Sequence, residues 1–274
     1  MSDVTILSPK SDIIFKLFFS DERNIDLLRD FLKSVINLPE DDYNEITILD
    51  PHLLRDRPGD KMGILDVKLT SKSGKIIHLE AQVLPMPHME SRVVYYQSKM
   101  ITEQLAEGDD YDKIKRTISI VITDYDFIKE TSKYRKRFLY CDPDDSVVFT
   151  DISEIYALDL TKLPQEFDGS ALCDWLKFLA AETEAEFEMV AERNTQIQTA
   201  VVRLKELSAD EKTRMLYEAR EKERRDNRAR EKGARLEERT TIAKRLILRG
   251  RSIEEIVEDT GLTYAEVEGL RNNC

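Results

Sequence analysis

Apolar residues recur at helical spacing near the start of the chain. The pattern predicts two amphipathic helices within residues 9–37, with a break near Ser20. The predicted buried positions are Ile14, Phe15, Phe18, Phe19, Leu27, Leu28, Phe31, Leu32 and Val35. A later helical pattern covers residues 90–108 and ends at Gly108, a residue typical of helix ends.

Strands are predicted where β-branched and apolar residues cluster or alternate with polar ones. These segments are residues 45–50, 64–69, 77–83, 115–124, 134–141, 146–150 and 154–160. Together with the helices, their order favours an α/β or α+β domain with a mixed central sheet flanked by helices.

The chain after about Gly169 predicts helices alone, an all-α C-terminal extension. Residues 171–192 form one amphipathic pattern, residues 210–240 a highly charged one, and the remainder three short helices. The expected domains are therefore residues 1–170, 171–240 and 241–274.

Composition and cysteine usage indicate the cellular compartment and the state of the thiols. Hydrophobic residues make up 41% of the 274 residues, and no apolar run reaches the roughly 20 residues that cross a membrane. The N-terminus lacks the basic and apolar regions of a secretory signal, so a cytoplasmic protein is expected. Three cysteines without metal-ligand spacing favour reduced thiols over disulfides or zinc.

The charge is unevenly distributed. The net charge of −12 has the wrong sign for a simple nucleic-acid-binding chain. Residues 212–251, however, hold fifteen Lys and Arg against seven Asp and Glu, a net of +8, which leaves −20 for the rest. This basic segment could follow a DNA backbone, or its interleaved acidic residues could pair with it on a solvated helix.

The segment "GILDVKLTSKSGKIIHLEAQV", residues 63–83, predicts a β-hairpin. A three-residue loop with Gly74 in the left-handed conformation pairs Ser71 with Lys75, and counting outward places Asp66 opposite Glu80. Like charges so opposed are destabilising, and a hard divalent cation such as Mg²⁺ would neutralise them. The alternative is two carboxylates on the solvent face of an ordinary hairpin.

A resemblance to a known family favours a bound divalent cation over two solvent-exposed carboxylates. Asp66, Glu80 and Gln82 form the pattern D-x13-E-x-Q, which resembles the PD-(D/E)XK nucleases. The segments "SDIIFKLFF", "LDVKLTSKSGKIIHLEAQ", "SRVVYYQSKMITEQLAEGDDY" and "IKRTISIVITD" look like the branch of recombination-promoting nucleases and transposases. The resemblance covers roughly residues 9–170 and implies a restriction-endonuclease-like, four-stranded mixed sheet.

The resemblance also implies Mg²⁺-dependent cleavage of DNA, with Mn²⁺ as an alternative metal. Asp66 and Glu80 would be metal ligands. Gln82 stands where the broader superfamily has lysine, so it could orient water but could not supply positive charge. Asp12 would be a further acidic contact and Lys16 a substitute for the missing lysine, or the two would form a local ion pair.

Arg92 and Tyr96, four residues apart on the predicted third helix, have two interpretations. They could contact and orient a DNA phosphate, or Tyr96 could lie in the core while Arg92 pairs with a carboxylate. The last thirty residues resemble a helix-turn-helix in spacing. Because Glu266 and Glu268 on its second helix would repel phosphates, a packing or dimerisation module is favoured there.

Two functions follow from these features. The first is a DNA endonuclease that hydrolyses phosphodiester bonds, promotes recombination and forms a homodimer where both strands are cut. The second is a non-catalytic DNA-binding or helical assembly protein that retains a nuclease fold, motivated by Gln82 and the charged helices.

Overall fold

The computed structural model describes residues 5–53 and 65–272, and the chain forms two compact units, residues 1–215 and 216–274. The strands are β1 (Thr47–Leu49), β2 (Val67–Thr70), β3 (Ile76–Gln82), β4 (Thr117–Thr123), β5 (Arg135–Cys141) and β6 (Val148–Asp159). The helices are α1 (Asp12–Phe19), α2 (Ile25–Val35), α3 (Met89–Thr102), α4 (Ala171–Ala180), α5 (Glu184–Ala191), α6 (Thr195–Ala209), α7 (Glu211–Leu248), α8 (Ile253–Thr260) and α9 (Tyr264–Asn272).

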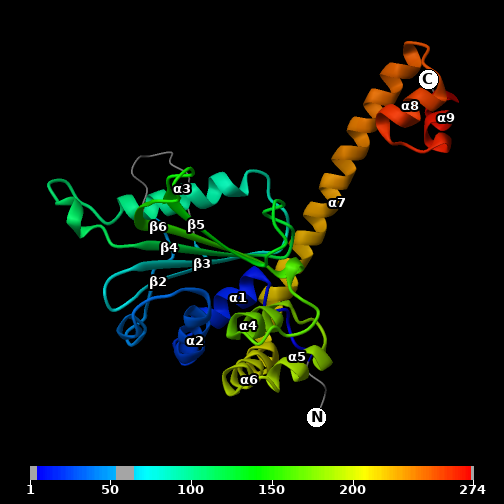
Figure 1. Ribbon diagram of the computed structural model, residues 1–274. Coiled ribbons are helices and arrows are strands. Elements are labelled where there is room, and N and C mark those ends of the chain that lie inside the picture. Colours follow the sequence, from blue (N-terminus) through cyan, green and yellow to red (C-terminus); the bar gives the residue numbers. More distant parts are fainter. Residues whose placement is uncertain (1–4, 54–64, 273–274) are drawn as a thin grey trace. The chain divides into compact units, whose positions relative to one another are not determined.

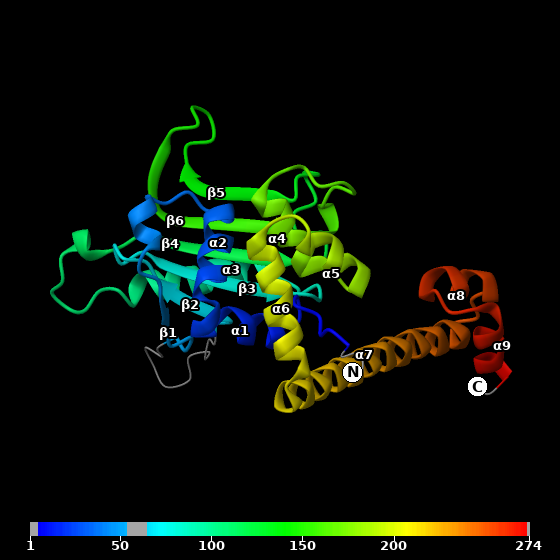
Figure 2. The ribbon, with the colours of Figure 1, turned by 90° about the horizontal axis from the view of Figure 1, so that it is seen from below.

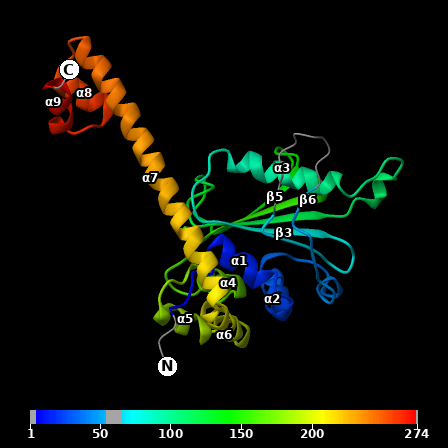
Figure 3. The same cartoon turned by 180° about the vertical axis from the view of Figure 1, so that it is seen from behind.

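A mixed sheet is the centre of the first unit. Its strand order is β1-β2-β3-β4-β6-β5, with β3, β4 and β6 parallel and the other neighbours antiparallel. Helix α3 covers one face, while α1, α2, α4, α5 and α6 lie on the other (Figures 1 and 3). The predicted α/β class is confirmed, but the sheet has six strands rather than four. Segments 146–150 and 154–160 form one continuous strand, β6.

The hairpin has the predicted register. Ser71 N–H donates to Lys75 O at 3.0 Å, and Val67 lies opposite Leu79. Gly74 has φ of 84°, a conformation that costs glycine little, so loop length and glycine together determine the pairing. Ile64, predicted as the start of the first strand, lies outside the described residues.

Aromatic side chains fill the core between the sheet and the larger helical layer. Phe19 lies 4.8 Å from Phe15 and 5.2 Å from Phe31, measured between ring centroids. Trp175 of α4 packs against Phe31 at 5.7 Å, and its indole N–H donates to Asp30 at 2.8 Å. The predicted apolar positions of the first two helices are all buried, which confirms that helical spacing identified this face.

Helices α4 to α6 belong to the same compact unit as the sheet. They pack on α1 and α2, so the boundary expected at residue 170 does not separate two compact units. The single helix expected over residues 171–192 is two helices, because Thr183 and Glu186 form a capping box that starts α5.

The second unit contains a small core of its own. Ala243, Ile256 and Val267 are fully or almost fully buried there. The expected boundary at residue 240 falls inside α7, and the first of the three predicted short helices is the end of α7. Ser252 caps α8, and Gly261, with φ of 64°, ends it before α9 begins. No described helix is long and apolar enough to cross a membrane.

Gln97 attaches α3 to the sheet. Its Nε2 donates to the backbone oxygens of Thr117 at 2.7 Å and Glu154 at 3.2 Å, and its Oε1 accepts from Ser119. Because Gln97 is buried, each of these bonds replaces one that water would otherwise make. The helix that carries Arg92 is therefore held at a defined position over β4 and β6.

Asp42 should make stability depend on pH at the acid end. It accepts from Ser73 N at 3.1 Å and Lys75 Nζ at 2.7 Å and so holds the hairpin loop. Burial alone would raise its pKa, but these bonds outweigh burial and lower the pKa to about 2. A lowered carboxyl pKa gives stability that is present above pH 4 and lost between pH 4 and 2.

We therefore expect Asp42→Asn to cost about 2 kcal/mol of unfolding free energy at pH 7 and almost nothing at pH 2. Denaturant unfolding across this pH range is the measurement. An Asp42→Asn profile parallel to that of the wild type would contradict the assignment. Exposed Asp112, replaced by Asn, is the control.

Candidate active site

Asp66 and Glu80 meet at the end of the β2–β3 pair. Asp66 directly precedes β2, and the register that pairs Val67 with Leu79 places Asp66 opposite Glu80. Asp66 Oδ2 accepts from the N–H of Ala81 at 3.1 Å. Glu80 is only 4% exposed, although the alternative interpretation had both carboxylates in solvent.

Both carboxyl groups resist ionisation here. Burial, followed by the charge of Glu80, raises the pKa of Asp66 to about 7. Burial also raises the pKa of Glu80, against the opposing effect of Arg92. Two buried carboxylates side by side favour protonation of one or the arrival of a cation.

Arg92 is one cation already present. Its Nη2 lies 3.0 Å from Glu80 Oε1, and its guanidinium stands 5.0 Å from the ring centroid of Tyr96. Its Nη1 faces Met86 Sδ at 3.7 Å, and its Nε is buried without a hydrogen-bond partner among the described residues. Tyr96 is 5% exposed and packs in a core cluster with Leu65. Arg92 therefore pairs with a carboxylate and keeps unused donors.

Gln82 and helix α1 border the same pair of carboxylates. Gln82 Nε2 donates to Leu84 O at 2.8 Å, which leaves its side-chain oxygen and its second amide N–H for water. Asp12 raises the pKa of Asp66 and Lys16 lowers it, so both α1 residues lie close enough for their charges to act there. Gln82, Asp12 and Lys16 therefore lie around the carboxylate pair, where β3 passes beside α1.

Two neighbouring side chains were given no role by sequence reasoning. His78 Nε2 lies 3.9 Å from Glu80 Oε2, and neither atom has a hydrogen-bond partner in the described part of the chain. Burial, then Arg92 and Lys68, lowers the pKa of His78 to about 3, so the imidazole is neutral. His78 shares the alternation of Glu80 and Gln82, a signal that could have identified it.

The hydroxyl of Tyr125 is also buried, and the backbone of Met86 lies beside it. Burial raises its pKa most, and Glu80 contributes. Tyr125 follows the buried strand β4 by two residues, at the end of the sheet where Glu80 lies, and strand ends of this kind commonly carry functional side chains.

The donor set suits a hard divalent cation. Mg²⁺ usually takes one or two carboxylates and fills its other positions with water and phosphate oxygens. Asp66 and Glu80 supply the carboxylates, and Glu80 Oε2 is a buried acceptor without a partner among the described residues. No cluster of three or more His, Cys, Asp or Glu able to hold a metal occurs within residues 5–53 and 65–272. The fit is therefore to a two-carboxylate site.

Comparison with known proteins identifies the family of this chain. A family model described as PD-(D/E)XK nuclease family transposase matches residues 9–234. No curated protein and no solved structure matches the chain significantly. The matched segment includes the whole sheet, α1 to α6 and much of α7. The chain therefore belongs to the PD-(D/E)XK nuclease family of transposases.

Proposed function

We propose that this protein is a metal-dependent DNA endonuclease that hydrolyses phosphodiester bonds and acts in recombination. The observation that supports it best is the pairing of half-buried Asp66 with buried Glu80, because both pKa values are raised and Glu80 Oε2 has no hydrogen-bond partner among the described residues. The family is nuclease-like, which makes DNA the expected substrate.

Asp66 and Glu80 would hold Mg²⁺, with Mn²⁺ as an alternative. Such a cation lowers the pKa of bound water and stabilises charge on a phosphodiester oxygen. Gln82 would orient a water molecule through its side-chain oxygen, while one of its two amide N–H groups is bonded to Leu84 O. Asp12 would add negative charge near Asp66, and Lys16 would supply part of the positive charge that Gln82 lacks.

Arg92 would bind a phosphate through the donors that Glu80 does not use, with Tyr96 holding the guanidinium plane. The basic segment of residues 212–251 would add contacts to the DNA backbone. A homodimer in the cytoplasm would bring two such sites to the two strands.

Supercoiled plasmid provides the test of function. Purified protein should nick or linearise it with Mg²⁺ or Mn²⁺ and leave it intact with EDTA. Absence of cutting under every metal, by protein that circular dichroism shows to be folded, would overturn the proposal.

A non-catalytic DNA-binding or assembly protein is the second candidate. The ion pair between Arg92 and Glu80 favours it, because a resident guanidinium already neutralises the carboxylate. This candidate predicts equal DNA affinity with Mg²⁺ and with EDTA, and no cutting. An affinity that rises with metal would count against it.

The phosphate contact of Arg92 can be tested apart from cutting. In EDTA, Arg92→Gln should weaken DNA binding and lower the slope of log affinity against log salt by about 1, the effect of losing one phosphate contact. Arg23→Gln is a matched control, because Arg23 is exposed and lies between α1 and α2, on the opposite face of the sheet. An unchanged salt slope in Arg92→Gln would mean that Arg92 does not contact a DNA phosphate and serves only in its ion pair with Glu80.

A further inference from the structure

The end of strand β5 and the start of β6, with the turn between them, extend beyond the helix-covered part of the sheet as a two-stranded arm, residues 138–152 (Figure 2). Its turn closes with a bond from Asp142 N–H to Val147 O at 2.8 Å. Large apolar side chains are exposed along it, and Phe149 is 88% exposed. The exposed set is Phe138, Tyr140, Val147, Val148, Phe149 and Ile152. Monomeric proteins rarely leave so many apolar side chains together in water.

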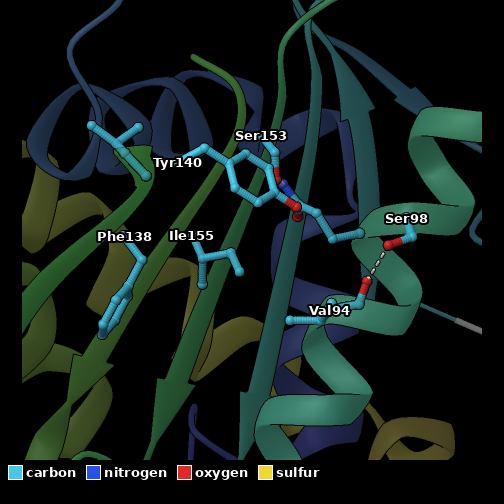
Figure 4. Close-up of a pocket in the computed structure, with 8 residues that line it drawn as sticks. Val94, Ser98, Phe138, Tyr140, Ser153 and Ile155 are labelled. Carbon is cyan, nitrogen blue, oxygen red and sulfur yellow. Dashed lines mark hydrogen bonds between the residues drawn. The ribbon is translucent and has the colours of Figure 1, made fainter. Parts of the chain in front are cut away.

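A groove lies between α3 and the base of this arm. Its volume is about 130 Å³, close to the roughly 150 Å³ of a cavity that accepts benzene. Phe138, Tyr140 and Ile155 line it from the sheet side, and Val94 and Ser98 from α3 (Figure 4). The groove therefore has the size and the lining for one aromatic side chain.

β5 is also the last strand of the sheet. In the part of the chain that the structure describes, no strand pairs with its outer side. Outer edges of this kind accept a further strand through their backbone groups. The pairing of β5 with β6 changes register between Leu139 and Cys141, where residues 151–153 of β6 are the extra residues.

Charge along the arm selects the partner. Exposed Lys133, Arg135 and Arg137 lie near the end that joins the sheet. The opposite end is acidic, with exposed Asp142, Asp144, Asp145 and Asp151. Nucleic acid would be repelled by the acidic tip, whereas a second arm running antiparallel brings its basic end to that tip.

We propose that this arm and its groove bind the same surface of a second copy of the chain, with the two β5 edges antiparallel about Leu139. This pairing places Phe138 of each copy opposite Tyr140 of the other, where aromatic residues pack well. It brings the acidic turn that holds Asp145 of each copy near Lys133, at the basic end of the other copy. The inference rests on the proposed homodimer but is independent of DNA cleavage.

Cross-linking tests the position of the two-fold axis. Leu139→Cys in a background with Cys141→Ser and Cys274→Ser should form a disulfide-linked dimer under mild oxidation, because residues on the axis meet their own copies. Tyr111→Cys is the control. Tyr111 is 84% exposed and lies away from the arm, so a cysteine there should not cross-link. Equal cross-linking by both variants, or none by Leu139→Cys, would overturn the proposal.

Charge reversal tests whether positions 133 and 145 of the two copies lie near each other. Restoration of cross-linking in a mixture of the two variants shows that neither variant is misfolded. Adding Lys133→Glu or Asp145→Lys to the Leu139→Cys chain should each lower cross-linking about tenfold. A mixture of the two variants should restore it. The acidic side chain introduced at position 133 of one copy then faces the basic side chain introduced at position 145 of the other, and the remaining natural pair stays intact. Absence of restoration, with both variants folded, would show that these charges do not meet.

Discussion

Glu80→Gln is expected to lower plasmid cleavage at saturating Mg²⁺ by at least about 100-fold. A metal ion contributes several kcal/mol of transition-state stabilisation, and each 1.4 kcal/mol is a factor of ten. Glutamine has nearly the shape of glutamate, so the change removes a charged ligand while keeping the buried volume. Asp66→Asn should have a comparable effect because it removes the other carboxylate.

The thermal stability of Glu80→Gln separates this effect from unfolding. The substitution removes one of two adjacent buried carboxylates, so the protein should stay folded, although Arg92 loses its partner. Asp112→Asn, at an exposed position, should cut plasmid at the wild-type rate. Cleavage by Glu80→Gln within a few-fold of the wild-type rate would remove Glu80 from the metal site.

Glu154→Gln is expected to cost about 3–5 kcal/mol of unfolding free energy, the typical result of removing one partner from a buried ion pair. Glu154 is completely buried on β6, where it pairs with Arg116 and Arg137 and accepts from Tyr156 OH at 3.3 Å. Its loss would leave the largely buried guanidinium of Arg116 and the more exposed one of Arg137 without their shared carboxylate.

Differential scanning calorimetry or denaturant unfolding measures this cost, and a fall in Tm of roughly 10 °C is expected for a unit of this size. Glu206→Gln is the control. Glu206 is exposed and pairs with Arg203 at 2.8 Å, so its loss should change stability by less than about 1 kcal/mol. Equal effects of the two substitutions would mean that the ion pairs of Glu154 with Arg116 and Arg137 stabilise the fold no more than one surface ion pair does.

The parts of the fold that local rules determine were predictable. The register of Val67 with Leu79 follows from the loop length, Gly74 and the alternation of the strands, all within twenty residues. The facing carboxylates followed from that register alone. The capping box of Thr183 and Glu186 was also present in the sequence, but the continuous apolar periodicity concealed the helix break there.

Features made by distant residues were not predictable. Sequence reasoning gave a carboxylate partner for Arg92 as one of two interpretations, but the choice of Glu80 depends on where α3 crosses the sheet, which Gln97 determines through contacts with β4 and β6. The polar face of β3 looked solvent-exposed because alternation reports one apolar face and says nothing about a helix packed on the other. For the same reason the alternation placed His78 on the face of Glu80 and Gln82 without indicating that it is buried.

Calorimetric titration of Mn²⁺ tests most directly whether Asp66 and Glu80 share a cation, and it needs no cleavage. The wild-type chain should bind one ion per copy at this site, and both Glu80→Gln and Asp66→Asn should lose that binding while Asp112→Asn retains it. Unchanged Mn²⁺ affinity in the two site variants would contradict the account, whatever activity the protein has on DNA.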